Sequence, residues 1–188
     1  MCFDVKRLFL ALDIPGAVKD ALLGFQPGPG AGLRPVSREG LHLTLCFIGV
    51  ADIEQVHRAI RLLRPREFSL QIRGLGRYGH AKGGVLWAGV EPCKGLLALQ
   101  RRLSVALSQA DIPVDTKRFR PHITLARYKA GVSKCRIERF LQQSDRLVLD
   151  PVRIHHFLLF SSDTRPEGAV YRIERRYPLI GNGRNRPI

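Results

Sequence analysis

Two short motifs with the same residue types carry the chemical potential of this sequence. Residues 41–45 read LHLTL and residues 121–125 read PHITL, so that two histidines, His42 and His122, lie 80 residues apart. Side chains alternate between the two faces of a strand, so the histidine shares one face with Thr44 or Thr124 while the apolar residues face the other way. An imidazole titrates near neutrality, so one histidine can accept a proton while the other donates one.

These residue types favour phosphoryl transfer by in-line displacement without a metal or a cofactor. The two threonine hydroxyls are expected to donate hydrogen bonds to the non-bridging oxygens of a phosphate held between the histidines. Threonine is stiff about its first side-chain torsion, which keeps such a donor in place. No cluster of Asp, Glu, His or Cys has metal-ligand spacing, and the four cysteines are spread along the chain, so neither a metal site nor a disulfide framework is expected.

The elements that must position these motifs alternate between strand and helix periods. The expected strands are 6–14, 41–48, 68–75, 85–90, 121–127, 151–161 and 170–177, and the expected helices are 15–25, 53–63, 94–110 and 133–143. The segment 26–37, rich in glycine and proline, predicts a loop. The order of elements in the first half is repeated in the second, which indicates an internal duplication. Two similar lobes that face one another would enclose a cleft, and ligands favour such junctions.

Length and charge limit the class of protein. The 188 residues are expected to form a single two-lobed domain, 1–188, with a flexible tail at 181–188. A net charge of +15 indicates a polyanionic partner, with nucleic acid as the first candidate and an anionic membrane as the second. Because no stretch has the apolar length of a bilayer span or of a signal peptide, we expect a cytoplasmic protein that does not bind membranes.

The motifs and their context resemble a known family. RLFLALDIP near the start, LHLTLCFIG, GGVLWAGV, FRPHITLAR, LLFSS and VYRIERRYPL together resemble the RNA 2′,3′-cyclic phosphodiesterases, also called 2′-5′ RNA ligases, of the two-histidine phosphoesterase superfamily. The resemblance implies an α+β fold with two pseudo-symmetric lobes, each with an antiparallel sheet and helices, around a central cleft. It also implies an enzyme that hydrolyses RNA ends or small nucleotides carrying a 2′,3′-cyclic phosphate to 2′-phosphomonoesters. We expect the protein to be a monomer.

The resemblance further implies a role for each motif residue. His42 matches the proton donor to the leaving ribose oxygen, His122 matches the base that activates water, and Thr44 and Thr124 match the substrate-binding threonines. Arg127 matches the arginine that follows the second motif. Strand alternation gives Arg127 the parity of the core residues, so it reaches the cleft only if the strand ends or bulges near residue 126.

The sequence is also compatible with two functions other than hydrolysis. The same chemistry could serve the joining of RNA ends through a 2′-5′ bond. A basic RNA-binding module with a catalytically silent cleft is the other alternative, against which the intact histidines and threonines of both motifs argue.

Overall fold

The computed structural model describes residues 4–80, 83–115, 117–165 and 168–181. The predicted tail at 181–188 therefore lies, apart from its first residue, outside the described residues. Within them the chain is an α+β fold whose strands pair antiparallel throughout the main sheet. The strands of this sheet are β1 (Val5–Asp13), β2 (Leu33–Pro35), β3 (His42–Asp52), β5 (Ile72–His80), β6 (Gly83–Val90), β7 (His122–Lys129), β9 (His156–Arg165) and β10 (Gly168–Pro178).

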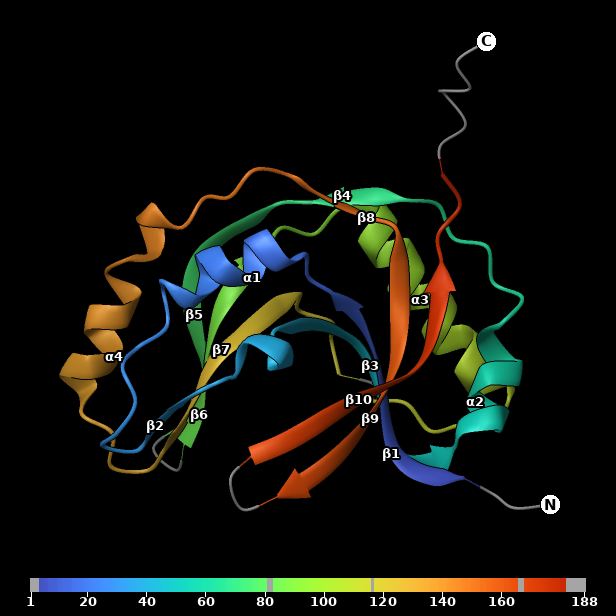
Figure 1. Ribbon diagram of the computed structural model, residues 1–188, viewed down its shortest axis with the longest axis horizontal. Coiled ribbons are helices and arrows are strands. Elements are labelled where there is room, and N and C mark those ends of the chain that lie inside the picture. The colour runs from blue at the N-terminus through green and yellow to red at the C-terminus, as the bar shows by residue number, and fades with distance from the viewer. Residues whose placement is uncertain (1–3, 81–82, 116, 166–167, 182–188) are drawn as a thin grey trace, which may run out of the picture.

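The helices cover the outside of this sheet. They are α1 (Gly16–Leu23), α2 (Ile53–Ile60), α3 (Lys94–Gln109) and α4 (Lys134–Leu141), and α4 lies at the opposite end of the molecule from α2 and α3 (Figure 1). α3 buries leucines at positions 96, 99, 103 and 107, the spacing of one helix face. Asp52 caps α2 by accepting a hydrogen bond from the Gln55 amide at 2.8 Å. α3 is thus packed against the rest of the fold by one apolar stripe.

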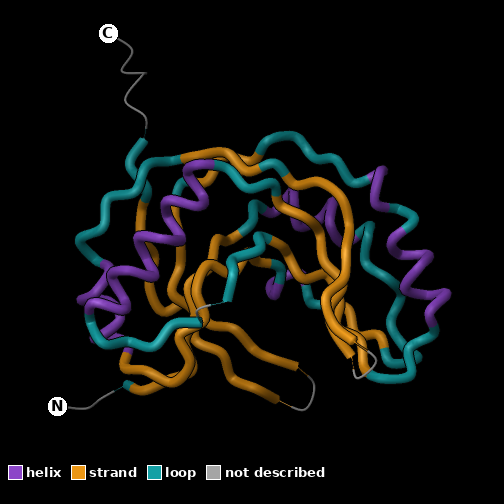
Figure 2. The backbone as a smooth tube through the Cα atoms, turned by 180° about the vertical axis from the view of Figure 1, so that it is seen from behind, coloured by secondary structure: helices purple, strands orange, loops and turns teal. Residues whose placement is uncertain are grey.

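The main sheet is continuous, with the order β10-β9-β1-β3-β7-β6-β5 and β2 alongside β7. Its two halves meet only where β3 and β7 pair at Leu43 and Ile123. The resemblance implied an antiparallel sheet in each half, and the α+β fold with antiparallel pairing is confirmed; the strands of both halves belong to one sheet. The apolar residues of both motifs pack into one core. Seen from behind, strands fill the centre of the molecule and helices lie at both of its sides (Figure 2).

Two segments that were each expected to form one strand form two strands each. The expected strand at 68–75 divides into β4 (Phe68–Leu70) and β5, and that at 151–161 divides into β8 (Val152–Ile154) and β9. The division comes where the chain changes partners, because β4 and β8 pair with each other in a small sheet of their own before the chain enters the main sheet. A continuous apolar run does not reveal such a change. The predicted loop at 26–37 also contains the short strand β2.

The pairing itself contains an approximate two-fold axis. β3 pairs with β7 between equivalent residues, Leu43 and Ile123, and the short strands pair at their equivalent central residues, Ser69 and Arg153. Antiparallel pairing between equivalent residues is what a two-fold axis produces. The equivalent strands β5 and β9 each cross over to the other half, since β9 pairs with β1 and β5 pairs with β6. This relation supports the internal duplication inferred from the sequence.

Candidate active site

The contact between β3 and β7 brings both motifs to one cavity. His42, Thr44, His122 and Thr124 are half-buried and line a cavity of about 520 Å³, which Arg127 also lines. All five residues singled out in the sequence therefore lie in the same place. Within the described residues, no group of three or more His, Cys, Asp or Glu side chains is arranged to hold a metal ion.

A β-bulge follows each motif threonine. In the pairing of β1 with β3, Leu45 has no partner, and in the pairing of β6 with β7, Leu125 has none. An extra residue in one strand shifts the alternation of all that follow it. Arg127 therefore lies on the same face of the strand as His122 and Thr124. Strand alternation required a bulge or a strand end near residue 126 for Arg127 to reach the cleft, and this bulge provides it.

The same bulge acts on Phe47 in the first motif. Phe47 lies three residues after Thr44, as Arg127 lies three residues after Thr124, and both side chains are exposed and line the cavity. The pseudo-symmetric positions thus carry an aromatic ring in one half and a guanidinium group in the other.

Each histidine is oriented by the backbone two residues before it. His122 Nδ1 lies 2.8 Å from the carbonyl oxygen of Arg120, and the His42 imidazole is hydrogen-bonded to the backbone of Gly40. A carbonyl oxygen only accepts, so Nδ1 of His122 carries the hydrogen in this contact and leaves Nε2 as the reactive nitrogen. Gly40 has no room for a side chain, since a Cβ there would lie 2.7 Å from Cγ1 of Val36.

A tyrosine stands edge-on to each imidazole. The ring centres of Tyr171 in β10 and His42 are 5.1 Å apart, with an interplanar angle of 87°. The ring centres of Tyr78 in β5 and His122 are 5.2 Å apart, with an interplanar angle of 85°. Phe9 packs against His42 at 5.0 Å. These rings restrict the rotation of both imidazoles and remove water from around them.

Burial dominates the electrostatics of His42. Burial lowers the pKa of His42 from 6.5 to about 4, against a hydrogen bond with the Gly40 backbone that acts in the opposite direction. The positive charges of Lys19 and Arg127 lower the pKa of His42 further, while Asp13, whose carboxylate is 2.8 Å from Lys19 Nζ, raises it. In the empty cavity His42 is therefore neutral at pH 7.

The cavity is strongly positive. Arg7, Arg34 and Arg127 line it, and the last two are direct partners across β2 and β7. Three guanidinium groups that line one cavity favour a bound anion. The cavity is thus suited to a phosphate or another compact anion.

Comparison with known proteins agrees with this chemistry. The profile of the 2′-5′ RNA ligase superfamily matches residues 25–164. The chain belongs to this superfamily. Its relatives there include the RNA 2′,3′-cyclic phosphodiesterase of Thermus thermophilus, which is 31% identical over 93% of this chain and 91% of the relative. The RNA 2′,3′-cyclic phosphodiesterase of Thermotoga maritima is 30% identical over 89% of this chain and 92% of its own.

Solved structures of relatives share the fold of this chain. The crystal structure of TT0787 of Thermus thermophilus matches with a TM-score of 0.77 and 31% identity, over 94% of this chain and 99% of that one. The crystal structure of Escherichia coli LigT complexed with phosphate matches with a TM-score of 0.68 and 26% identity, over 94% and 98% of the two chains. The resemblance drawn from the paired motifs is confirmed at the level of the superfamily and of the α+β fold.

The sequence left several cavity residues of this superfamily member unassigned. The sequence singled out neither Phe47, which lines the cavity, nor Tyr78, which contacts the His122 ring. Aligning the two halves at their histidines would have found Phe47, since it falls on the position of Arg127. Nothing in the local sequence marks Tyr78, because its place beside His122 depends on the pairing of β5 with β6. No helix of the described residues is long and apolar enough to cross a bilayer.

Proposed function

We propose that this protein hydrolyses 2′,3′-cyclic phosphates at RNA ends and leaves 2′-phosphomonoesters, with His42 and His122 supplying both proton transfers. The observation that carries the proposal is the convergence of two His-x-Thr pairs, from pseudo-symmetric strands, on one arginine-lined cavity. Its relatives named RNA 2′,3′-cyclic phosphodiesterase support the choice of substrate. Because the two histidines can move both protons, the reaction as proposed needs no metal ion.

The proposed reaction balances with one water molecule. Neutral His122 takes a proton from water at Nε2 while the water oxygen forms a bond to phosphorus. The bond from phosphorus to the ribose 3′ oxygen breaks, and protonated His42 delivers its proton to that oxygen. The phosphate stays on the 2′ oxygen. Thr44 and Thr124 donate hydrogen bonds to its non-bridging oxygens, and Arg127 offsets their growing negative charge.

His42 must be charged in this reaction, although it is neutral in the empty cavity. An anionic phosphate bound beside the imidazole favours the charged form and raises the pKa of His42. The substrate therefore brings about the protonation that its own cleavage requires. A free cavity with a neutral His42 also avoids placing another positive charge beside Arg127 and Lys19.

The proposal is tested with an oligoribonucleotide that ends in a 2′,3′-cyclic phosphate, incubated with purified protein in excess chelator. Phosphorus NMR of the product distinguishes 2′ from 3′ monoesters. We expect a pure 2′ product, abolished in the variants His42→Asn and His122→Asn. A pure 3′ product would reverse the two histidine roles, and joined 2′-5′ products in place of monoesters would favour the ligase activity. Binding of the oligonucleotide without turnover would refute hydrolysis.

A further inference from the structure

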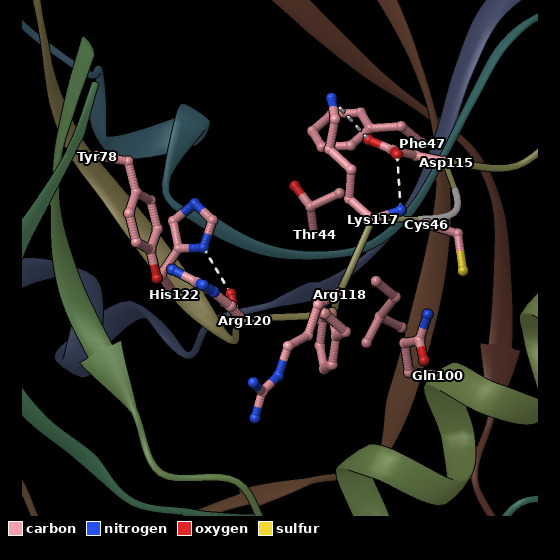
Figure 3. A pocket seen from close by; sticks show the side chains of 12 residues that line it. Thr44, Cys46, Phe47, Tyr78, Gln100, Asp115, Lys117, Arg118, Arg120 and His122 are labelled. Atoms are coloured by element: carbon pink, nitrogen blue, oxygen red, sulfur yellow. Dashed lines mark hydrogen bonds and ion pairs between the residues drawn. The ribbon is translucent and has the colours of Figure 1, made fainter. Parts of the chain in front are cut away.

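A second cavity adjoins the cavity that both motifs line, which we call the catalytic cavity. It measures about 400 Å³ and shares Thr44, Phe47 and His122 with the first. Figure 3 shows His122 and Tyr78 on one side of it and Phe47 with Asp115 and Lys117 on the other. A ligand in the catalytic cavity therefore has a direct continuation into this one.

The second cavity combines an apolar wall with a positive rim. Leu45, Cys46, Phe47 and Phe119 form the apolar part, while the rim carries Lys117, Arg118 and Arg120. Lys117 is paired with Asp115 at 3.6 Å. For the side chains of Arg118 and Arg120, the described part of the chain supplies no ion-pair or hydrogen-bond partner. Apolar surface beside unpaired cations suits a nucleobase attached to a phosphate.

Hydrogen bonds connect the backbone of the rim, residues 115–120 as far as they are described, to both motif strands. The Asp115 amide donates to the Phe47 carbonyl of β3 at 3.3 Å, and the Arg120 carbonyl accepts from His122 of β7. The backbone on either side of Lys117 and Arg118 is thus attached to both motif strands, which keeps these cations near the reacting phosphate. Flexible surface charges would lack this relation.

Phe47 stands at the boundary of the two cavities with 59% of its surface exposed. Stacking on aromatic side chains is the usual way in which proteins bind single-stranded bases, and an exposed ring beside a cavity lined by arginines can serve this purpose. Arg127 occupies the pseudo-symmetric position at the other end. The site therefore has an anion-binding end and an aromatic end.

We propose that the second cavity holds the neighbouring nucleotide of an RNA strand, an inference that rests on the proposed function. A 2′,3′-cyclic phosphate closes the 3′ end of a strand, so the one neighbour of the terminal nucleotide is attached through its 5′ oxygen. The base of that neighbour stacks on Phe47, and the phosphate that links the two nucleotides lies at Arg118. The substrate class is thus an RNA end of two or more nucleotides, in preference to a cyclic mononucleotide.

The test compares a cyclic-phosphate-ended dinucleotide with the cyclic mononucleotide of the same terminal base. We expect the wild-type kcat/KM to favour the dinucleotide by about tenfold or more, since stacking and one phosphate contact are both gained. Arg118→Gln should lower this preference by the part that the linking phosphate contributes, while the part due to stacking on Phe47 remains. Arg139→Gln, an equal loss of charge on the exposed side of α4, is the matched control and should keep it. Dissociation constants for mono- and dinucleotides that end in a 2′-phosphate give the same comparison without turnover.

The outcomes separate the subsite from the reaction. A wild-type enzyme that does not distinguish the two substrates, or a preference that Arg118→Gln leaves intact, would overturn the subsite. Loss of the preference in Arg139→Gln as well would assign it to overall charge and would also overturn the subsite. If neither substrate is hydrolysed, the proposed function fails, while tighter binding of the dinucleotide that depends on Arg118 would still support the subsite.

Discussion

The protonation of His42 gives the most direct test of the site. Burial holds the pKa of this imidazole at about 4 in the empty cavity. A unit negative charge roughly 4 Å away at an effective dielectric constant of about 20 contributes about 4 kcal/mol. That energy corresponds to a rise of about 3 pKa units. We therefore expect a bound phosphate to raise the pKa of His42 to about 7.

The measurement is an NMR titration of the His42 ring carbon-bound proton, with and without saturating inorganic phosphate. The variant His42→Asn assigns the signal. The variant Arg127→Gln serves as a comparison, because it removes one of the positive charges that lower the pKa of His42 and weakens the hold on the anion. In this variant the pKa of the free imidazole should rise, and more phosphate should be needed to raise it further.

Two results would refute the reasoning. A free-state pKa near that of an exposed histidine would mean that burial does not control the imidazole. A pKa that stays low when phosphate saturates the cavity would mean that the anion does not bind beside His42, and substrate-induced protonation would then fail as an account of the acid.

Three further predictions concern stability and turnover. The folded-state pKa of His42 lies below the unfolded value, so the free energy of unfolding is highest above about pH 6.5 and falls by about 3 kcal/mol as the pH is lowered toward 4. Urea denaturation should show a smaller fall in this free energy over the same pH range in His42→Asn. An equal fall in both proteins would contradict the burial of His42. Replacing His122 with Ala should lower kcat for a cyclic phosphate by ~10²–10⁴ in single-turnover assays, and near wild-type turnover would exclude it as the base. Gly40→Ala should lower both kcat and thermal stability, because the new Cβ meets Val36 at 2.7 Å and displaces the backbone that orients His42; unchanged kinetics would show that this hydrogen bond does not position the imidazole.

The sequence predicted the site better than the sheet that holds it. His42 and Thr44 could be found because alternation within a strand is a local property that needs only neighbouring residues. The exposure of Arg127 depends on a bulge that forms between strands, so the sequence could state the condition for it but not the outcome. Phe47 escaped notice because an apolar ring in a strand has the same local pattern whether it faces the core or a ligand.

The larger errors concerned partners distant in the chain. The residues at 68–75 and 151–161 have continuous apolar character, yet Gln71 and His155 mark points where the chain leaves one sheet for another. The low pKa of His42 likewise depends on Lys19 and on burial by strands far away in sequence. Such features are set by tertiary contacts, which short-range patterns do not contain.

The exchange of the last strands, β9 to β1 and β5 to β6, ties the two repeats together in folding. The first repeat cannot complete its part of the sheet until nearly the whole chain is available, since β1 pairs with a strand that begins at His156. Pairings of such long sequence separation slow folding and make it cooperative across the whole molecule. A polypeptide with one repeat alone could complete its sheet only by exchanging that strand with a second copy, so the two-histidine cavity has two repeats as its smallest unit, in one chain or in a pair.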